Sequence, residues 1–133
     1  MPNFTSPFRW RLVAQTSDAY ELHDIDLLDR RFTDASGDRS AFFRLSIRYP
    51  NLWTPPVLRA AGTELGRVYL GFSRFPAARS VVEPDGFATV RWSDMRFVGG
   101  LIGLDQTARQ TDAFTATIRM APDGTVLRQT LGP

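Results

Sequence analysis

Apolar and polar positions alternate along two neighbouring stretches near the start of the chain. In "FRWRLVAQ", Phe8, Trp10, Leu12 and Ala14 alternate with polar residues, which is the two-residue period of a half-buried strand. The turn-forming residues "TSDA" follow, and "YELHDIDLL" then has the pattern of a returning strand. The pattern predicts a β-hairpin over residues 8–28.

A third strand is favoured after a polar loop. The stretch "AFFRLSIRYP" places Phe43, Leu45, Ile47 and Tyr49 on one face and polar residues on the other. Phe42, Leu45 and Tyr49 also fit the spacing of a helix, so the helical alternative stays open.

The stretch "TPPVLRAAGTELGRVYLGF" is the one good candidate for a helix. Its Thr54 can cap a first turn that contains two prolines, and its apolar residues recur at helical intervals. The glycines argue against one straight helix, since an interior glycine costs about 1 kcal/mol relative to alanine. We expect a break at Gly62, a short second helix capped by Thr63, and a strand that starts near Leu70. The residues predicted to point inward are Leu58, Ala61, Leu65, Val68 and Phe72.

The rest of the chain has the pattern of two more hairpins. "EPDG" and "APDG" are matching turns, in which proline presets φ and glycine takes the position with positive φ. Alternating segments flank each turn, and a connection that is first glycine-rich and then polar separates the two hairpins. Together the elements predict an α+β fold, with a mainly antiparallel curved sheet of about six to seven strands and one broken helical segment packed on it.

Length and composition indicate one domain. The chain has 133 residues, of which 43% are hydrophobic, so residues 1–133 are expected to form a single soluble domain around one core. Cysteine is absent, which excludes disulfides, thiolate nucleophiles and cysteine-based metal sites. The longest apolar run, "FVGGLIGL", is far shorter than the ~20 residues of a membrane-spanning helix. The first residues do not have the pattern of a signal peptide.

The basic residues are unusual in kind. All sixteen are arginine, against fourteen acidic residues, which gives a formal net charge of +2. Guanidinium groups suit phosphate and carboxylate ligands, although biased codon usage explains the absence of lysine more simply. A nucleic-acid surface needs arginines gathered on one stripe. The arginines are instead spread evenly along the sequence with acids between them, so a nucleic-acid partner is not expected.

The stretch "HDIDLLD" is the one candidate for a metal site. It contains His23, Asp24, Asp26 and Asp29. On a strand His23 points away from Asp24 and Asp26, so the set does not converge on one ion. A site with a single histidine and no cysteine would also be unusual for a catalytic transition metal, so no metal site is expected.

An acidic and a basic residue lie two positions apart in "WSDMRF", namely Asp94 and Arg96. They can pair across the sheet with Arg9 or Arg11, and such ion networks are commonly structural. The sequence contains no phosphate-binding glycine loop, Ser-His-Asp set or nucleophile elbow, so no catalytic residue is assigned. The candidate binding residues are Arg9, Trp10, Asp94 and Arg96.

The order of several short motifs resembles that of a known family. "SPFRWRLV", the tyrosine and "LLD" of the second strand, "FSRFP" and "VRWSDMRF" are similar to the C-terminal soluble region of bacterial inner-membrane proteins classed as metal-dependent hydrolases. The match runs from Ser6 to Phe97. The resemblance implies that membrane-spanning helices precede this region in the parent protein. It also implies that the histidines proposed to bind a divalent metal lie in those helices, so no cofactor is expected in this segment.

The resemblance therefore implies an accessory domain at one face of the bacterial inner membrane, with no active site of its own. Its implied partners are the transmembrane region of the same protein or the membrane surface, and a homo-oligomer is also open. The alternatives are a small-molecule or lipid-binding module and a protein-interaction domain. An independent enzyme is disfavoured, because no acid–base or metal constellation converges.

A contact surface is expected where apolar residues exceed the needs of a core. Trp53 and Tyr69 lie beside the helical stripe, and "FVGGLIGL", with Leu101 and Ile102, adds an apolar loop. Two such segments that lie exposed and close together would form an apolar patch of the kind that marks a contact. We expect this patch, rather than the arginine-rich hairpins, to face the bilayer or a second copy.

Overall fold

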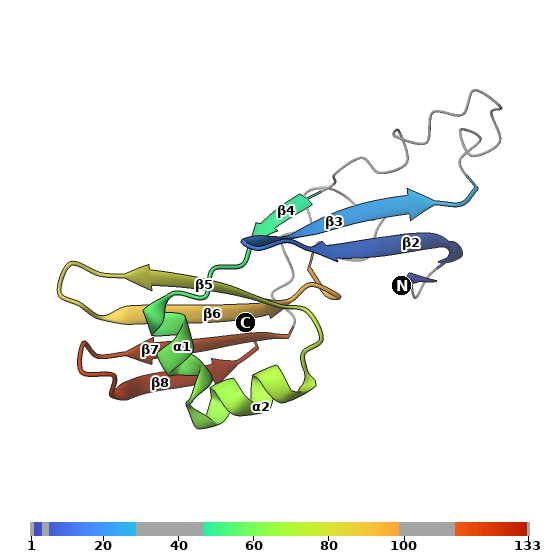
Figure 1. Cartoon of the computed structure of the whole chain (residues 1–133). Coiled ribbons are helices and arrows are strands. Elements are labelled where there is room, and N and C mark those ends of the chain that lie inside the picture. Colours follow the sequence, from blue (N-terminus) through green and yellow to red (C-terminus); the bar gives the residue numbers. More distant parts are fainter. Residues whose placement is uncertain (1, 4–5, 29–46, 99–113, 133) are drawn as a thin grey trace.

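Two antiparallel sheets and two helices make up the fold of the chain, which a computed structural model describes over residues 2–3, 6–28, 47–98 and 114–132 (Figure 1). The first four strands form sheet A in the order β1 (Pro2–Asn3), β2 (Ser6–Gln15), β3 (Ala19–Asp26) and β4 (Ile47–Pro50). The last four form sheet B in the order β5 (Pro76–Val82), β6 (Ala88–Asp94), β7 (Thr115–Met120) and β8 (Val126–Leu131). Between the sheets the chain forms α1 (Pro55–Ala61) and α2 (Glu64–Phe72).

The predicted α+β class and antiparallel pairing are confirmed, but the single sheet is wrong. The strands divide between β4 and β5. The backbone of β5 that lies nearest to β4 is paired with the linker: Ala78 donates its N–H to the side-chain oxygen of Asn51 (3.0 Å), and its carbonyl accepts from Leu52 (3.2 Å). Because Asn51 occupies this edge, β4 and β5 do not form a ladder and the sheet ends there.

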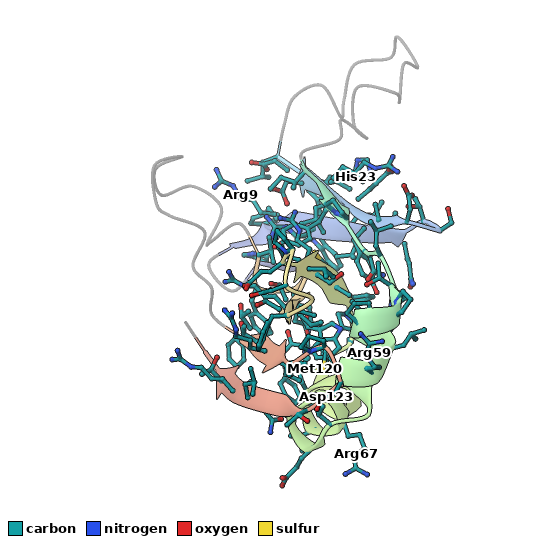
Figure 2. The ribbon with its side chains drawn as sticks, turned by 90° about the vertical axis from the view of Figure 1, so that its left-hand side faces the viewer. Arg9, His23, Arg59, Arg67, Met120 and Asp123 are labelled. Atoms are coloured by element: carbon teal, nitrogen blue, oxygen red, sulfur yellow. The ribbon has the colours of Figure 1, made fainter. Side chains whose placement is uncertain are left out.

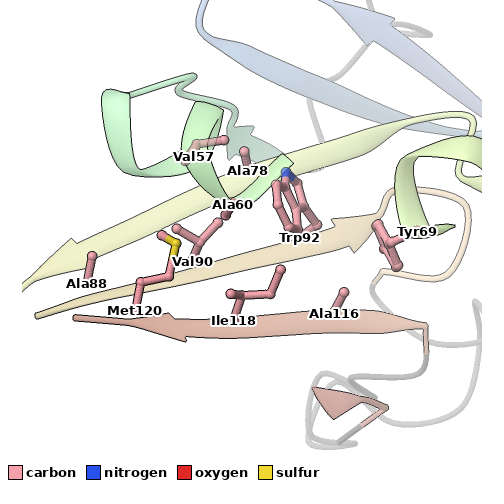
Figure 3. Packing of buried hydrophobic residues seen from close by; sticks show 10 residues of the cluster. All are labelled: Val57, Ala60, Tyr69, Ala78, Ala88, Val90, Trp92, Ala116, Ile118 and Met120. Atoms are coloured by element: carbon pink, nitrogen blue, oxygen red, sulfur yellow. The ribbon is translucent and has the colours of Figure 1, made fainter. Parts of the chain in front are cut away.

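The main core lies between the two helices and one face of sheet B. Figure 3 shows Val57, Ala60 and Tyr69 of the helices around Trp92 and its neighbours on the strands. The rings of Tyr69 and Trp92 stack with their centroids 6.4 Å apart. The buried cluster consists of Val57, Ala60, Tyr69, Ala78, Ala88, Val90, Trp92, Ala116, Ile118 and Met120.

The predicted helix break is confirmed, whereas the predicted inward stripe is wrong. Thr63 caps α2 by accepting the N–H of Gly66 at 3.1 Å. Three of the five residues expected to face inward are exposed, namely Leu58, Val68 and Phe72. The prediction counted one helical period through the break at Gly62. The two helices differ in direction, so each of them has its own buried face. The face of α1 carries Val57 and Ala60, and that of α2 carries Gly66 and Tyr69.

Two smaller expectations at the ends of the helices also need correction. Thr54 stands at the N-cap of α1, but its hydroxyl bonds with the hydroxyl of Ser80 (2.7 Å) and makes no cap. The strand expected near Leu70 starts later, because α2 continues to Phe72 and β5 begins only at Pro76.

Sheet A packs on the other face of sheet B, at one end of it (Figure 1). This second core joins Tyr20 and Leu22 of β3 to Ala77 of β5 and to the segment after β6, with Met95 and Val98. Partly buried Val13, Ile47, Tyr49 and Phe75 surround it. Beyond Ala77, the ring of Tyr49 extends this packing to Arg79 of β5.

The hairpins and their turns agree with the sequence. β2 and β3 pair along their length, and Gly86 and Gly124 take the positive φ angles of 86° and 89° that the two Pro-Asp-Gly turns require. The expected apolar loop from residue 99 onwards lies outside the described residues, as does the first part of the expected third strand, residues 41–46. The segment Ile47–Pro50 of that strand is β4.

Two glycines of α2 are expected to respond in opposite ways to alanine. A Cβ at Gly66 would lie 2.2 Å from the carbonyl oxygen of Ala60, so α1 and α2 must separate. A Cβ at Gly71 would meet no heavy atom within 4 Å. In urea unfolding we expect Gly66→Ala to lose about 2 kcal/mol or more, and Gly71→Ala to gain up to about 1 kcal/mol from its better helix propensity. Equal effects would show that the two helices do not pack at Gly66.

Candidate functional site

Asp94, at the end of β6, accepts hydrogen bonds from two segments of the chain, residues 73–74 and Arg96. Its fully buried Oδ2 atom accepts from the Ser73 hydroxyl at 2.8 Å, from the Arg74 N–H at 3.3 Å and from Nη2 of Arg96 at 2.6 Å. Its Oδ1 atom accepts the backbone N–H and Nε of Arg96, both at 3.0 Å. This carboxylate therefore holds the end of α2, the start of the connection to β5 and the turn after β6 in one place.

The environment keeps Asp94 ionised. Burial by itself would raise the pKa of its carboxyl group, but the hydrogen bonds from Arg96 and Ser73 outweigh burial and lower that pKa below its usual value. The pKa of Arg96 is raised, chiefly by the hydrogen bond to Asp94. The pKa of Tyr69 is raised too, by burial and then by the charge of Asp94, and its hydroxyl donates to the carbonyl of Phe114 at 2.7 Å. A low pKa and occupied oxygens make Asp94 a poor general acid or base near neutral pH.

The segment held by Asp94 also connects the two sheets. The N–H of Met95 donates to the carbonyl of Phe75 at 3.0 Å. Arg11 of sheet A forms a two-pronged pair with Asp24 (2.8 and 3.1 Å) and donates to the carbonyl of Val98. Since Met95 and Val98 belong to the core under sheet A, the turn after β6 is fixed from both sides.

The four residues singled out in the sequence do not form one site. Asp94 pairs with Arg96, in place of the suggested pairing with Arg9 or Arg11. Arg9 forms a half-exposed pair with Asp26 at 3.3 Å. Trp10, on the opposite face of β2, is exposed, and its ring N–H donates to the carbonyl of Pro7 at 3.0 Å. The ion pairs of the first hairpin therefore have structural partners within that hairpin.

The "HDIDLLD" segment has the geometry expected of it. Asp24 and Asp26 share a face with Arg11 and Arg9, and His23 faces the other side, 3.9 Å from Glu21. No group of three or more histidine and acidic residues that could hold a metal ion occurs in the described part of the chain. Asp29 lies outside it.

Sheet pairing gathers four arginines that are far apart in the sequence. Arg79 of β5 stands directly opposite Arg91 of β6, and Arg119 of β7 stands directly opposite Arg128 of β8. All four occupy positions that alternate with core residues, so they share the face of sheet B that the helices do not cover. We call this surface the arginine face; it consists of Arg79, Arg91, Arg119 and Arg128.

Threonines and two aromatic rings accompany the arginine face. Thr117 stands opposite Arg91, and Thr89 stands opposite Arg119. The guanidinium of Arg79 lies 4.1 Å from the ring centre of Tyr49, and that of Arg119 lies 5.6 Å from Phe87. Glu83, beside the face, pairs with Arg119 at 2.9 Å. The strand positions of β5 to β8 that point to this side carry no carboxylate.

The arginine face is the candidate site that sequence reasoning missed. The expectation of evenly spread arginines holds along the sequence but not in space. A signal was present: the "EPDG" turn fixes the register that puts Arg79 opposite Arg91, and the "APDG" turn brings Arg119 close to Arg128. The pairing of β6 with β7, across residues 95–114, could not be read in this way.

Like charges directly opposite each other in a sheet reduce stability unless a counter-charge lies near. Glu83 supplies such a charge for Arg119. Guanidinium forks and threonine hydroxyls are suited to bind oxyanions, whereas they provide no nucleophile or general base at neutral pH. The arrangement can therefore bind an anionic ligand.

No family model, curated protein or solved structure matches the chain. Neither described helix has the length and apolar character that crossing a membrane requires.

Replacing Asp94 by alanine should be severe, because it leaves the Arg96 guanidinium without its buried partner. We expect Asp94→Ala to lose about 3 kcal/mol or more in urea unfolding. Asp26→Ala, which breaks the half-exposed pair with Arg9, is the control and should lose less than about 1 kcal/mol. A loss below about 0.5 kcal/mol for Asp94→Ala would contradict the structural role and favour a functional one.

Proposed function

We propose that the chain is a non-catalytic accessory domain of a membrane-bound protein of the hydrolase-like class that it resembles. The observation that carries the proposal is the state of Asp94 and Arg96. These residues belong to the motif behind the resemblance, and their charged groups are bonded to each other and to Ser73 and Arg74. Bonds of this kind support a role of both residues in maintaining the fold.

An apolar stripe on the first hairpin supports a role in contact with another part of the protein. Phe8, Trp10 and Leu12 follow one another on one face of β2, and each is 40–46% exposed. Ile25 stands opposite Trp10 and extends the apolar stripe to β3. A row of large apolar side chains on one face of a sheet is typical of a surface that another element covers. In this proposal the stripe packs on the transmembrane region of the same protein.

This stripe is a different surface from the one expected from the sequence. Tyr69, which was expected to be surplus, is a core residue, and the "FVGGLIGL" loop lies largely outside the described residues. Trp53 is exposed next to the helices, as a contact role would allow.

Hydrolysis by the isolated chain is the direct test of the proposal. We expect the purified protein to turn over neither ester nor phosphoester substrates with added zinc or manganese, because its single histidine and its carboxylates do not converge on one ion. Zinc or manganese that stays bound in stoichiometric amount through dialysis, together with turnover that Asp24→Ala abolishes, would overturn the proposal.

The reading frame upstream of Met1 offers an independent check. An accessory domain should be preceded by several apolar runs of ~20 residues, each long enough to span a bilayer. A reading frame that begins at Met1 in every genome that encodes this chain would favour the alternative of a stand-alone binding module.

A further inference from the structure

We propose that the outer edge of β8 pairs with the same edge of a second copy of the chain, so that the two copies of sheet B join into one continuous sheet. The strand order places β8 at the border of sheet B. Among the described residues, no backbone group of another segment bonds to the outer side of β8. Sheet A, with Arg9 and His23, lies at the far end of the molecule from β8 and from α2 with Arg67 (Figure 2). The inference does not depend on the proposed accessory role.

The other sheet edges of the described chain carry features that hinder pairing with another chain. β1 consists of two residues and begins with Pro2, and β4 ends with Pro50. A proline offers no N–H to a neighbouring strand, and a very short edge strand offers few groups to pair with. The edge of β5 is occupied at Ala78 by the linker that follows β4. β8 has six residues and no proline, so its edge is the one that can accept another strand.

The register of β8 shows which of its backbone groups point outward. In an antiparallel pair, opposed residues that exchange hydrogen bonds alternate with opposed residues that do not. Gly132 donates its N–H to the carbonyl of Thr115 at 2.8 Å, so it occupies a bonded position. Two residues away, Thr130 therefore also occupies a position bonded to β7. The N–H and carbonyl groups of Gln129 and Leu131 then point away from β7, and both residues are exposed.

The side chains of β8 favour a second copy as the occupant of this edge. In an antiparallel pair centred on Gln129, the two Gln129 residues bond to each other, and Leu131 stands opposite Leu127 of the second copy. Leu127 and Leu131 are 52% and 58% exposed, so their contact removes apolar surface from water. Arg128 stands opposite Thr130 of the second copy, whereas a pair centred on Arg128 would place two guanidinium groups directly opposite each other. The strand is thus complementary to itself in hydrogen bonding and in charge.

The test is analytical ultracentrifugation of the whole chain over a wide range of concentrations. We expect the average mass to rise from 15.0 kDa toward twice that value as the concentration increases. Gln129→Pro removes the N–H at the centre of the pair, and proline is tolerated in an edge strand where the N–H faces outward. Because both copies lose this donor, two hydrogen bonds are lost, and the dissociation constant of the dimer should rise by at least roughly 10-fold.

Gln129→Ala is the matched control. The side-chain oxygen of Gln129 accepts the N–H of Leu65 in α2 at 3.2 Å, and both substitutions remove this bond. Only proline removes the outward N–H as well. The alanine variant should therefore dimerise within about 3-fold of the unchanged chain, as expected of a surface substitution. Circular dichroism of both variants should confirm that they are folded.

A second measurement needs no substitution. In the monomer the amides of Gln129 and Leu131 face water, whereas the amide of Thr130 is bonded to β7. We expect hydrogen exchange at Gln129 and Leu131 to slow as the concentration rises, while Thr130 is protected at every concentration.

Three outcomes would overturn the inference. The first is a mass of 15.0 kDa at every concentration with unchanged exchange at Gln129, which would leave the edge of β8 to a strand of another protein. The second is a folded Gln129→Pro variant that dimerises as readily as the alanine variant. The third is dimerisation that slows exchange elsewhere in the chain but not at Gln129. None of them concerns hydrolysis, so failure here is distinguishable from failure of the proposed accessory role.

Discussion

The bond between Asp94 and Arg96 is the constraint on which the rest of the structure depends. It lies where the end of α2, the connection to β5 and the turn after β6 meet, and the carboxylate is fully buried there. The segment that follows carries Met95 and Val98 into the second core, where sheet A rests on sheet B. A buried carboxylate is tolerated only when its oxygens are bonded, and this need selects arginine and serine as its neighbours.

This centre explains how two sheets form one fold. The helices cover one face of sheet B, and sheet A covers one end of the other face. Asn51 occupies the edge of β5 and keeps β4 from joining it. Strand register places four arginines on the remaining area of that face. The candidate binding surface is thus a result of the same division that ended the sheet.

Much of the fold could be predicted from local patterns in the sequence. Alternation and turn residues indicated the hairpins, and Gly62 with Thr63 indicated the break between the helices. The division into two sheets could not be predicted, because it depends on how Asn51 and Leu52 of the linker pair with Ala78. The partner of Asp94 was two residues away rather than across the sheet, and a local pair of this kind depends on how the turn after β6 closes.

The candidate site was harder to predict than the fold. Residues such as Trp10 and Asp94 stand out because they belong to the motifs behind the family resemblance. In the structure their hydrogen bonds hold strands and turns together. The arginine face has no motif, since its members come from four strands. Its recognition requires the register of β6 with β7, which local patterns do not contain.

The central claim is that the Asp94 centre holds the two sheets and the helices in one fold. Amide hydrogen exchange of the ¹⁵N-labelled chain, measured with and without Asp94→Ala, tests this claim most directly. The structure predicts that the substitution raises the exchange rates of amides in both sheets, those of Leu22 and Ile118 included. Faster exchange confined to Ser73, Arg74 and Arg96, with both sheets protected as before, would contradict it.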